Sequence, residues 1–119
     1  MTVHDVLAVP SATDVEFERL VHALVDEFRA ATAAHRERMI ADGPATSGKH
    51  EGLIAAVVSA LCREVGVTPP QWVRTVHSPE PYFAIPARGF ALRLRLMLES
   101  PPPFRTRNVF VPENYLSRA

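Results

Sequence analysis

The sequence predicts a small, mainly α-helical bundle in which residues 1–119 form a single domain. Three observations favour it: apolar residues recur every three or four positions over 13–41, a second helical period covers 51–65, and the C-terminal third is rich in proline. With 47% hydrophobic and 22% charged residues, the composition is typical of one soluble globular domain with a modest core. We expect roughly four or five helices, the two long ones running antiparallel.

The longest predicted element is one amphipathic helix over 13–41. Its apolar stripe consists of Phe17, Leu20, Val21, Leu24, Val25, Phe28, Ala31 and His35. Thr13 is a good N-cap with Glu16 three residues later, as in a capping box, while Gly43 and Pro44 end the helix. Charged residues of alternating sign off the stripe predict a solvated face: Glu18, Arg19, Asp26, Glu27, Arg29, Glu37 and Arg38.

The second predicted helix, 51–65, has apolar residues around most of its circumference, so we expect it to be the most buried element. Gly66 suits the left-handed position that follows a helix end. Before the long helix, residues 1–12 are predicted to be an N-terminal arm or a single helical turn, because Pro10 and Ser11 separate them from it.

The stretch 77–87 contains three prolines and is predicted to be irregular, with neither a regular helix nor a central strand. Pro70 opens a short turn through Trp72. The rings of Trp72, Tyr82 and Phe83 are expected to seal this part of the chain onto the core rather than to stack on a ligand.

Residues 88–100 carry two patterns at once. The alternation of leucine indicates a strand, but Leu, Arg, Met and Ala are strong helix formers and no β-branched residue is present, so we predict a helix. Residues 101–119 are expected to form a tail packed on the core or on a partner. Within it, the extended segment 109–111 needs a second strand to form a sheet. It packs as coil, pairs with the N-terminal VLAV, or pairs with a partner chain.

The net charge of zero conceals an asymmetry between the two halves of the chain. Residues 1–65 hold six Lys and Arg against ten Asp and Glu, a balance of −4, whereas 66–119 hold seven Arg against three Glu, a balance of +4. Such a charge dipole suits docking of the two halves on one another or a partner with an acidic patch. No signal-peptide pattern or membrane-spanning apolar run is present, which predicts a cytoplasmic protein. The lone Cys62 is expected to be a buried structural thiol.

Motifs for chemistry are weak, so we predict neither an enzyme nor a bound cofactor or metal. The stretch 43–49 fits G-x-x-x-x-G-K, but a phosphate-binding loop needs a buried strand before it and Ser or Thr after the Lys. Here a charged helix end precedes it and His50 follows. The five histidines show no metal-ligand spacing, and His22 is expected at the core boundary.

A series of segments runs through most of the chain from about residue 32. They are PATSG, the helix from Leu53 to Cys62, TPPQWV, PEPYF, LRLMLESPPPFRTRN and the closing VFV and LSRA. Together they resemble a group of short bacterial antitoxin-like proteins that are encoded beside nucleotidyltransferase-like toxins. The resemblance implies an antitoxin or accessory role exerted through direct protein contact.

Two functional hypotheses follow. The first is a non-enzymatic protein-binding module, an antitoxin that neutralises a partner toxin by direct contact. Its predicted partner-binding residues are Arg93, Arg95, Phe104, Arg105, Arg107, Phe110 and Tyr115. The alternative is a nucleic-acid-associated regulator that binds phosphates through the C-terminal arginine cluster. The long apolar stripe favours a homodimer over a monomer.

Overall fold

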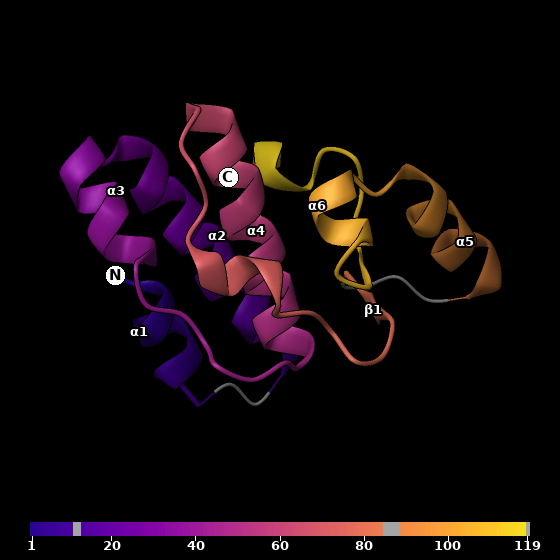
Figure 1. Cartoon of the computed structure of the whole chain (residues 1–119). Helices are drawn as coiled ribbons and strands as arrows, with labels where there is room; N and C mark the ends of the chain where they lie inside the picture. Colours follow the sequence, from indigo (N-terminus) through magenta and orange to yellow (C-terminus); the bar gives the residue numbers. More distant parts are fainter. Residues whose placement is uncertain (11–12, 85–88, 119) are drawn as a thin grey trace.

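The computed structural model describes residues 1–10, 13–84 and 89–118 and confirms a mainly α-helical bundle (Figure 1). Residues 11–12 and 85–88, which belong to the predicted segments 1–12, 77–87 and 88–100, lie outside these ranges. The elements in chain order are α1 Val3–Ala8, α2 Asp14–Ala30, α3 Ala33–Ile40, α4 Lys49–Val65, the 3₁₀-helix η1 Gln71–Arg74, β1 Tyr82–Phe83, α5 Phe90–Glu99, α6 Pro102–Arg105, β2 Val109–Phe110 and the 3₁₀-helix η2 Tyr115–Arg118. Within the described ranges, no helix is long and apolar enough to cross a membrane.

Helix α4 is the centre of the bundle, as predicted. Its residues from Gly52 to Val58 are all buried, and α2, η1, α6 and β2 pack around it. Gly66 ends the helix at a φ of 75°, a left-handed conformation that glycine adopts without strain. The Cys62 side chain is fully buried, and this burial raises the pKa of its thiol, which fits the expected structural role.

The single helix predicted over 13–41 is wrong, because the chain forms two helices there. Ala31 is extended, with φ −83° and ψ 159°, and ends α2. Thr32 then caps α3, since its side-chain oxygen accepts a hydrogen bond from the amide of His35 at 3.2 Å. Apolar periodicity continues through the break, so it could not reveal the new N-cap.

The break is stabilised by the side chain of Arg36. Its Nε and Nη2 groups donate to the carbonyl oxygens of Phe28 and Arg29, each at 2.8 Å. These carbonyls belong to the last turn of α2, where a helix leaves backbone acceptors unpaired. A side chain from α3 therefore replaces the backbone hydrogen bonds that a continuous helix would have made.

Helices α2 and α4 run parallel, which corrects the antiparallel arrangement expected from the sequence. At their starts His50 Nε2 lies 2.8 Å from Asp14 Oδ1, and at their ends Arg29 binds Glu64 at 2.9 Å. Because the chain turns at the end of α2, α3 and the loop 41–48 return it to the start of the bundle (Figure 1). One uninterrupted helix could not have made this return.

Strands β1 and β2 form a two-stranded parallel sheet, in which Tyr82 pairs with Val109 and Phe83 with Phe110. The strand that pairs with 109–111 therefore comes from 77–87, which was predicted to be irregular. Neither coil packing nor pairing with VLAV is observed, because Val6, Leu7 and Ala8 of that segment lie in α1 and Val9 is its C-cap. The sequence could not reveal this pairing, because each strand is only two residues long and the two strands lie far apart along the chain.

Both terminal segments pack on the core. Helix α1 has a capping box between Thr2 and Asp5 and buries Val3 and Val6, so residues 1–10 are an integral part of the bundle rather than an arm.

Trp72, expected as a packing anchor, donates from Nε1 to the carbonyl oxygen of Ile40 at 2.9 Å. The predicted helix over 88–100 is confirmed as α5.

Candidate protein-docking surface and its supporting network

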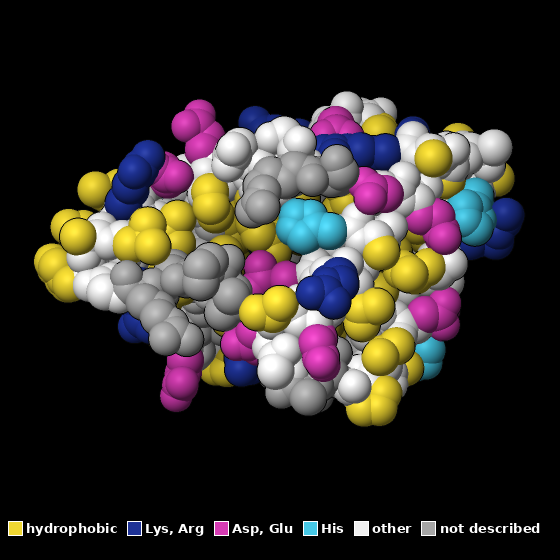
Figure 2. Space-filling view, turned by 180° about the vertical axis from the view of Figure 1, so that it is seen from behind, with side chains coloured by type: hydrophobic (Ala, Val, Ile, Leu, Met, Phe, Trp, Pro, Cys, Tyr) yellow, Lys and Arg dark blue, Asp and Glu magenta, His cyan; other side chains and the backbone are white. Residues whose placement is uncertain are grey.

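Helix α5 presents an exposed apolar surface, called here the α5 face, that consists of Phe90, Leu94, Met97 and Leu98. Phe90 is 81% exposed and Leu98 is 74% exposed. Phe90, Leu94 and Leu98 follow one another at helical spacing of four, so they share one side of the helix. Figure 2 shows hydrophobic side chains gathered at the α5 end of the molecule, on the left in that view. This exposed apolar surface makes α5 the candidate docking surface.

The opposite side of α5 holds the helix on the protein. Leu96 is the one buried residue of α5 and packs in a small cluster with Phe110 and Phe83, whose ring centroids lie 5.2 Å apart. Just after the helix, the buried Ser100 Oγ accepts a hydrogen bond from the amide of Val111 at 2.8 Å. Strand β2 therefore anchors α5 from beneath, while the α5 face stays exposed.

Positive charge borders the α5 face. The Arg93 guanidinium lies 5.0 Å from the centre of the Phe83 ring, and Arg95 Nε lies 3.1 Å from Glu99 Oε2 one turn along the helix. The side chains of Arg93 and Arg95 remain exposed, so both can contact a partner. Arg105 is also exposed, on α6.

The other predicted partner-binding residues lie in the interior. Phe104 and Tyr115 are buried, with ring centroids 5.9 Å apart, and Phe110 is buried beneath α5. Arg107 binds the chain itself, because its Nε and Nη2 groups both donate to the carbonyl oxygen of Val73, at 2.9 and 2.7 Å. Burial lowers the pKa of this guanidinium. The structure thus brings Arg93, Arg95 and Phe110 together at α5 and places the other aromatic residues and Arg107 within the fold's own contacts.

Sequence reasoning missed the exposed residues of the α5 face. The signal was present, because Phe90, Leu94, Met97 and Leu98 form one stripe at helical spacing. Leu96 lies on the other side of this stripe and makes the contact with the core. The alternation of leucine bears on the choice between helix and strand, whereas the helical spacing shows which side chains share a face.

A buried polar network lies behind β2. The Glu18 carboxylate accepts hydrogen bonds from the hydroxyls of Tyr82 at 2.9 Å and Tyr115 at 2.6 Å. Glu18 is only 7% exposed, so its predicted place on a solvated face was wrong. Desolvation, together with the charge of Glu18 and its hydrogen bond, raises the pKa of Tyr82 far above its usual value, which keeps the hydroxyl protonated as a donor. The network ties α2 to β1 and η2.

A second polar group joins the starts of α2 and α4. The His50 imidazole stacks on Phe17 with ring centroids 4.0 Å apart and contacts Asp14. Desolvation alone would raise the pKa of Asp14, but hydrogen bonds from His50 and Lys49 outweigh it and lower that pKa. The pair therefore acts as a partly buried clamp between the helices.

A serine and a histidine lie close together on the surface. Ser47 Oγ is 3.3 Å from His77 Nδ1, which is also 3.3 Å from the carbonyl oxygen of Thr75. A carbonyl only accepts hydrogen bonds, so this contact favours the tautomer with the proton on Nδ1. In that tautomer His77 donates to Ser47 and cannot take the hydroxyl proton, as activation of a serine nucleophile would require.

The remaining motifs keep their structural interpretation. The G-x-x-x-x-G-K loop over 43–49 follows helix α3 rather than a strand, and its Lys49 binds Asp14 at 3.0 Å. Across the described ranges, no group of three or more His, Cys, Asp and Glu residues is placed to hold a metal ion. No family model matches the chain, and no match was found among curated proteins or solved structures.

Proposed function

We propose that this protein is a non-enzymatic binding module, an antitoxin-like protein that neutralises a partner toxin by direct contact. The observation that carries the proposal is the α5 face, which exposes four large apolar side chains on a helix whose opposite side is anchored to the core. The class of partner comes from the sequence resemblance, which implies a nucleotidyltransferase-like toxin. Binding through this face would cover the apolar surface and hold the toxin in one orientation.

The α5 face fits an apolar groove with an acidic rim. The helix has 10 residues and is therefore about 15 Å long. Two such faces packed against each other would bury far less than the roughly 1,600 Å² of a standard stable interface. A groove that surrounds the helix covers more of it, which is the usual way in which an amphipathic helix is recognised. Acidic side chains on the rim would complement Arg93 and Arg95.

The test is a binding titration with a purified nucleotidyltransferase-like toxin of the class that the resemblance implies. The variant Phe90→Glu/Leu98→Glu is expected to weaken binding at least about 100-fold, because loss of two central anchors removes roughly 3 kcal/mol or more. Val15→Glu is the matched control, since Val15 is a 45% exposed apolar residue on α2. It should bind like the wild type. Equal binding by the double variant rejects the α5 face, and no complex with the wild type rejects the antitoxin function.

Two further measurements separate the competing occupants of the α5 face. Light scattering that shows a wild-type dimer, converted to a monomer by Leu98→Glu, would assign the face to a second copy. Duplex DNA binding that falls steeply with salt and is lost on replacing Arg93 and Arg95 by alanine would favour the nucleic-acid regulator instead. For the proposed function we expect Leu98→Glu to leave the oligomeric state of the wild type unchanged, and we expect no salt-sensitive DNA binding.

A further inference from the structure

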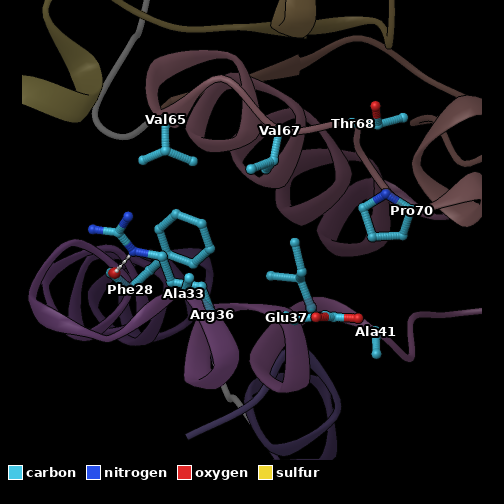
Figure 3. Close-up of a pocket in the computed structure, with 10 residues that line it drawn as sticks. Phe28, Ala33, Arg36, Glu37, Ala41, Val65, Val67, Thr68 and Pro70 are labelled. Carbon is cyan, nitrogen blue, oxygen red and sulfur yellow. Dashed lines mark hydrogen bonds between the residues drawn. The ribbon is translucent and has the colours of Figure 1, made fainter.

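A groove of about 530 Å³ lies between α3, the end of α2, and the end of α4 with the loop that follows it. Its volume falls in the range of small-molecule sites. One wall carries Phe28 and Ile40, and the other carries Val65, Val67 and Pro70, so the lining is mainly apolar (Figure 3). The groove belongs to the α3 end of the molecule, whereas α5 lies at the opposite end (Figure 1). It is therefore separate from the α5 face.

The polar group at one end of this groove is a guanidinium in a fixed orientation. Arg36 lies 5.3 Å from the centre of the Phe28 ring, and the two backbone carbonyls that it binds occupy the edge formed by Nε and Nη2. The second edge, formed by Nη1 and the other proton of Nη2, has no acceptor among the described residues. A guanidinium edge of this kind matches the two oxygens of a carboxylate. Because the protein already holds the side chain, little conformational freedom is lost on binding.

The charged side chains that line the groove also fix the orientation of a bound ligand. The Arg36 guanidinium stands near Val65, whereas the Glu37 carboxylate stands beside Ala41 at the other end (Figure 3). Glu64, whose pKa is lowered mainly by its hydrogen bonds with Arg29 and also by the charge of Arg36, is already paired with Arg29. A bound anion is therefore attracted to the Arg36 end and repelled from the Glu37 end.

We propose that this groove binds a small aliphatic monocarboxylate. The carboxylate pairs with the second edge of Arg36, and the alkyl chain lies against the apolar walls formed by Ile40, Val65 and Val67. A dicarboxylate is excluded because its second charge would approach Glu37. This site does not depend on the α5 face or on the proposed toxin partner.

The test is an NMR titration of the ¹⁵N-labelled protein with octanoate, and with octylammonium as a probe of the same chain length but opposite charge. Octanoate is expected to give saturable amide shifts at Ala33, Val67 and Thr68, which line the groove. Octylammonium should bind at least about tenfold more weakly, because it loses a charge-assisted pair and meets a like charge. Equal binding of both probes, or octanoate shifts confined to the amides of α5, would overturn the proposal.

Two variants test the site without relying on one side chain. Arg36→Lys keeps the positive charge but loses the planar fork, so octanoate binding should fall about tenfold. Since Arg36 also supports the break between α2 and α3, this variant alone could act by loosening the fold. Val67→Trp fills the groove from a residue that is 50% exposed and leaves Arg36 in place. Unchanged octanoate affinity in a folded Val67→Trp protein rejects the groove as the site.

Discussion

Replacing Glu18 with alanine is expected to lower the free energy of unfolding by about 3 to 4 kcal/mol. The carboxylate is buried and accepts hydrogen bonds from two tyrosine hydroxyls. Its removal takes this acceptor from Tyr82 and Tyr115 inside the protein, and each buried hydroxyl left without its acceptor costs about 1 to 3 kcal/mol. Urea denaturation measures the change directly, and a fall in Tm of roughly 12 to 16 °C should accompany it.

Three further variants test whether the loss of stability comes from the hydrogen bonds of Glu18 with Tyr82 and Tyr115. Asp26→Ala changes an exposed acid on the same helix and should alter stability by less than about 0.5 kcal/mol. Tyr115→Phe alone removes one donor and should cost about half as much as Glu18→Ala. The triple variant Glu18→Leu/Tyr82→Phe/Tyr115→Phe removes donors and acceptor together, so it should regain much of the loss. If Glu18→Ala is as mild as Asp26→Ala, the network contributes little to stability.

The position of Glu18 shows what a helical pattern can predict. Glu18, Val21 and Val25 lie on neighbouring lines of the helix surface, because their spacings are three and four. The sequence therefore places Glu18 at the edge of the apolar stripe. It does not reveal the two tyrosines, which come from β1 and η2 far along the chain. A carboxylate can be buried only where such partners accompany it. Because local charge patterning contains no information about them, it predicted a solvent-exposed Glu18.

The same distinction explains which parts of the fold could be predicted. Local signals succeeded, as in the N-cap at Thr13, the left-handed Gly66 and the helical composition of α5. Features set by contacts between distant segments failed, including the parallel packing of α2 and α4 and the pairing of β1 with β2. Single-sequence periodicity carries no information about these contacts.

The arginines show how much of the candidate site can be predicted from the sequence. Arg105 and Arg107 stand two residues apart and look equivalent in the sequence, yet Arg105 is exposed and Arg107 binds the carbonyl oxygen of Val73. Arg93 and Arg95 are exposed as well, and their role in partner binding stays a prediction from clustered charge. The α5 face itself depends on which side of a short helix meets the core, and Phe110 and Phe83 decide this from the sheet below.

Replacing Gly52 with alanine is expected to destabilise the protein by about 2 kcal/mol. A Cβ atom at this position of α4 would lie 2.4 Å from the Ser78 amide nitrogen and 2.8 Å from the His77 carbonyl carbon. Overpacking of this kind costs about 1 to 3 kcal/mol or more, whereas the helix propensity of alanine returns at most about 1 kcal/mol. Because the contact is with backbone, no side chain can turn aside to relieve it. The change in urea midpoint against wild type measures the effect.

The position of the clash links this variant to the α5 face. The Ser78 amide donates to the carbonyl oxygen of Arg107 at 2.9 Å, next to the strands that carry Phe83 and Phe110 beneath α5. Displacing residues 77–78 should therefore weaken that hydrogen bond and the contacts that hold α5 on the core. The measurement is amide hydrogen exchange, which should become faster in α5. Ser59→Ala on the same helix is the control and should leave both measurements near the wild type. Wild-type stability of Gly52→Ala would mean that α4 and the 77–78 backbone do not approach this closely.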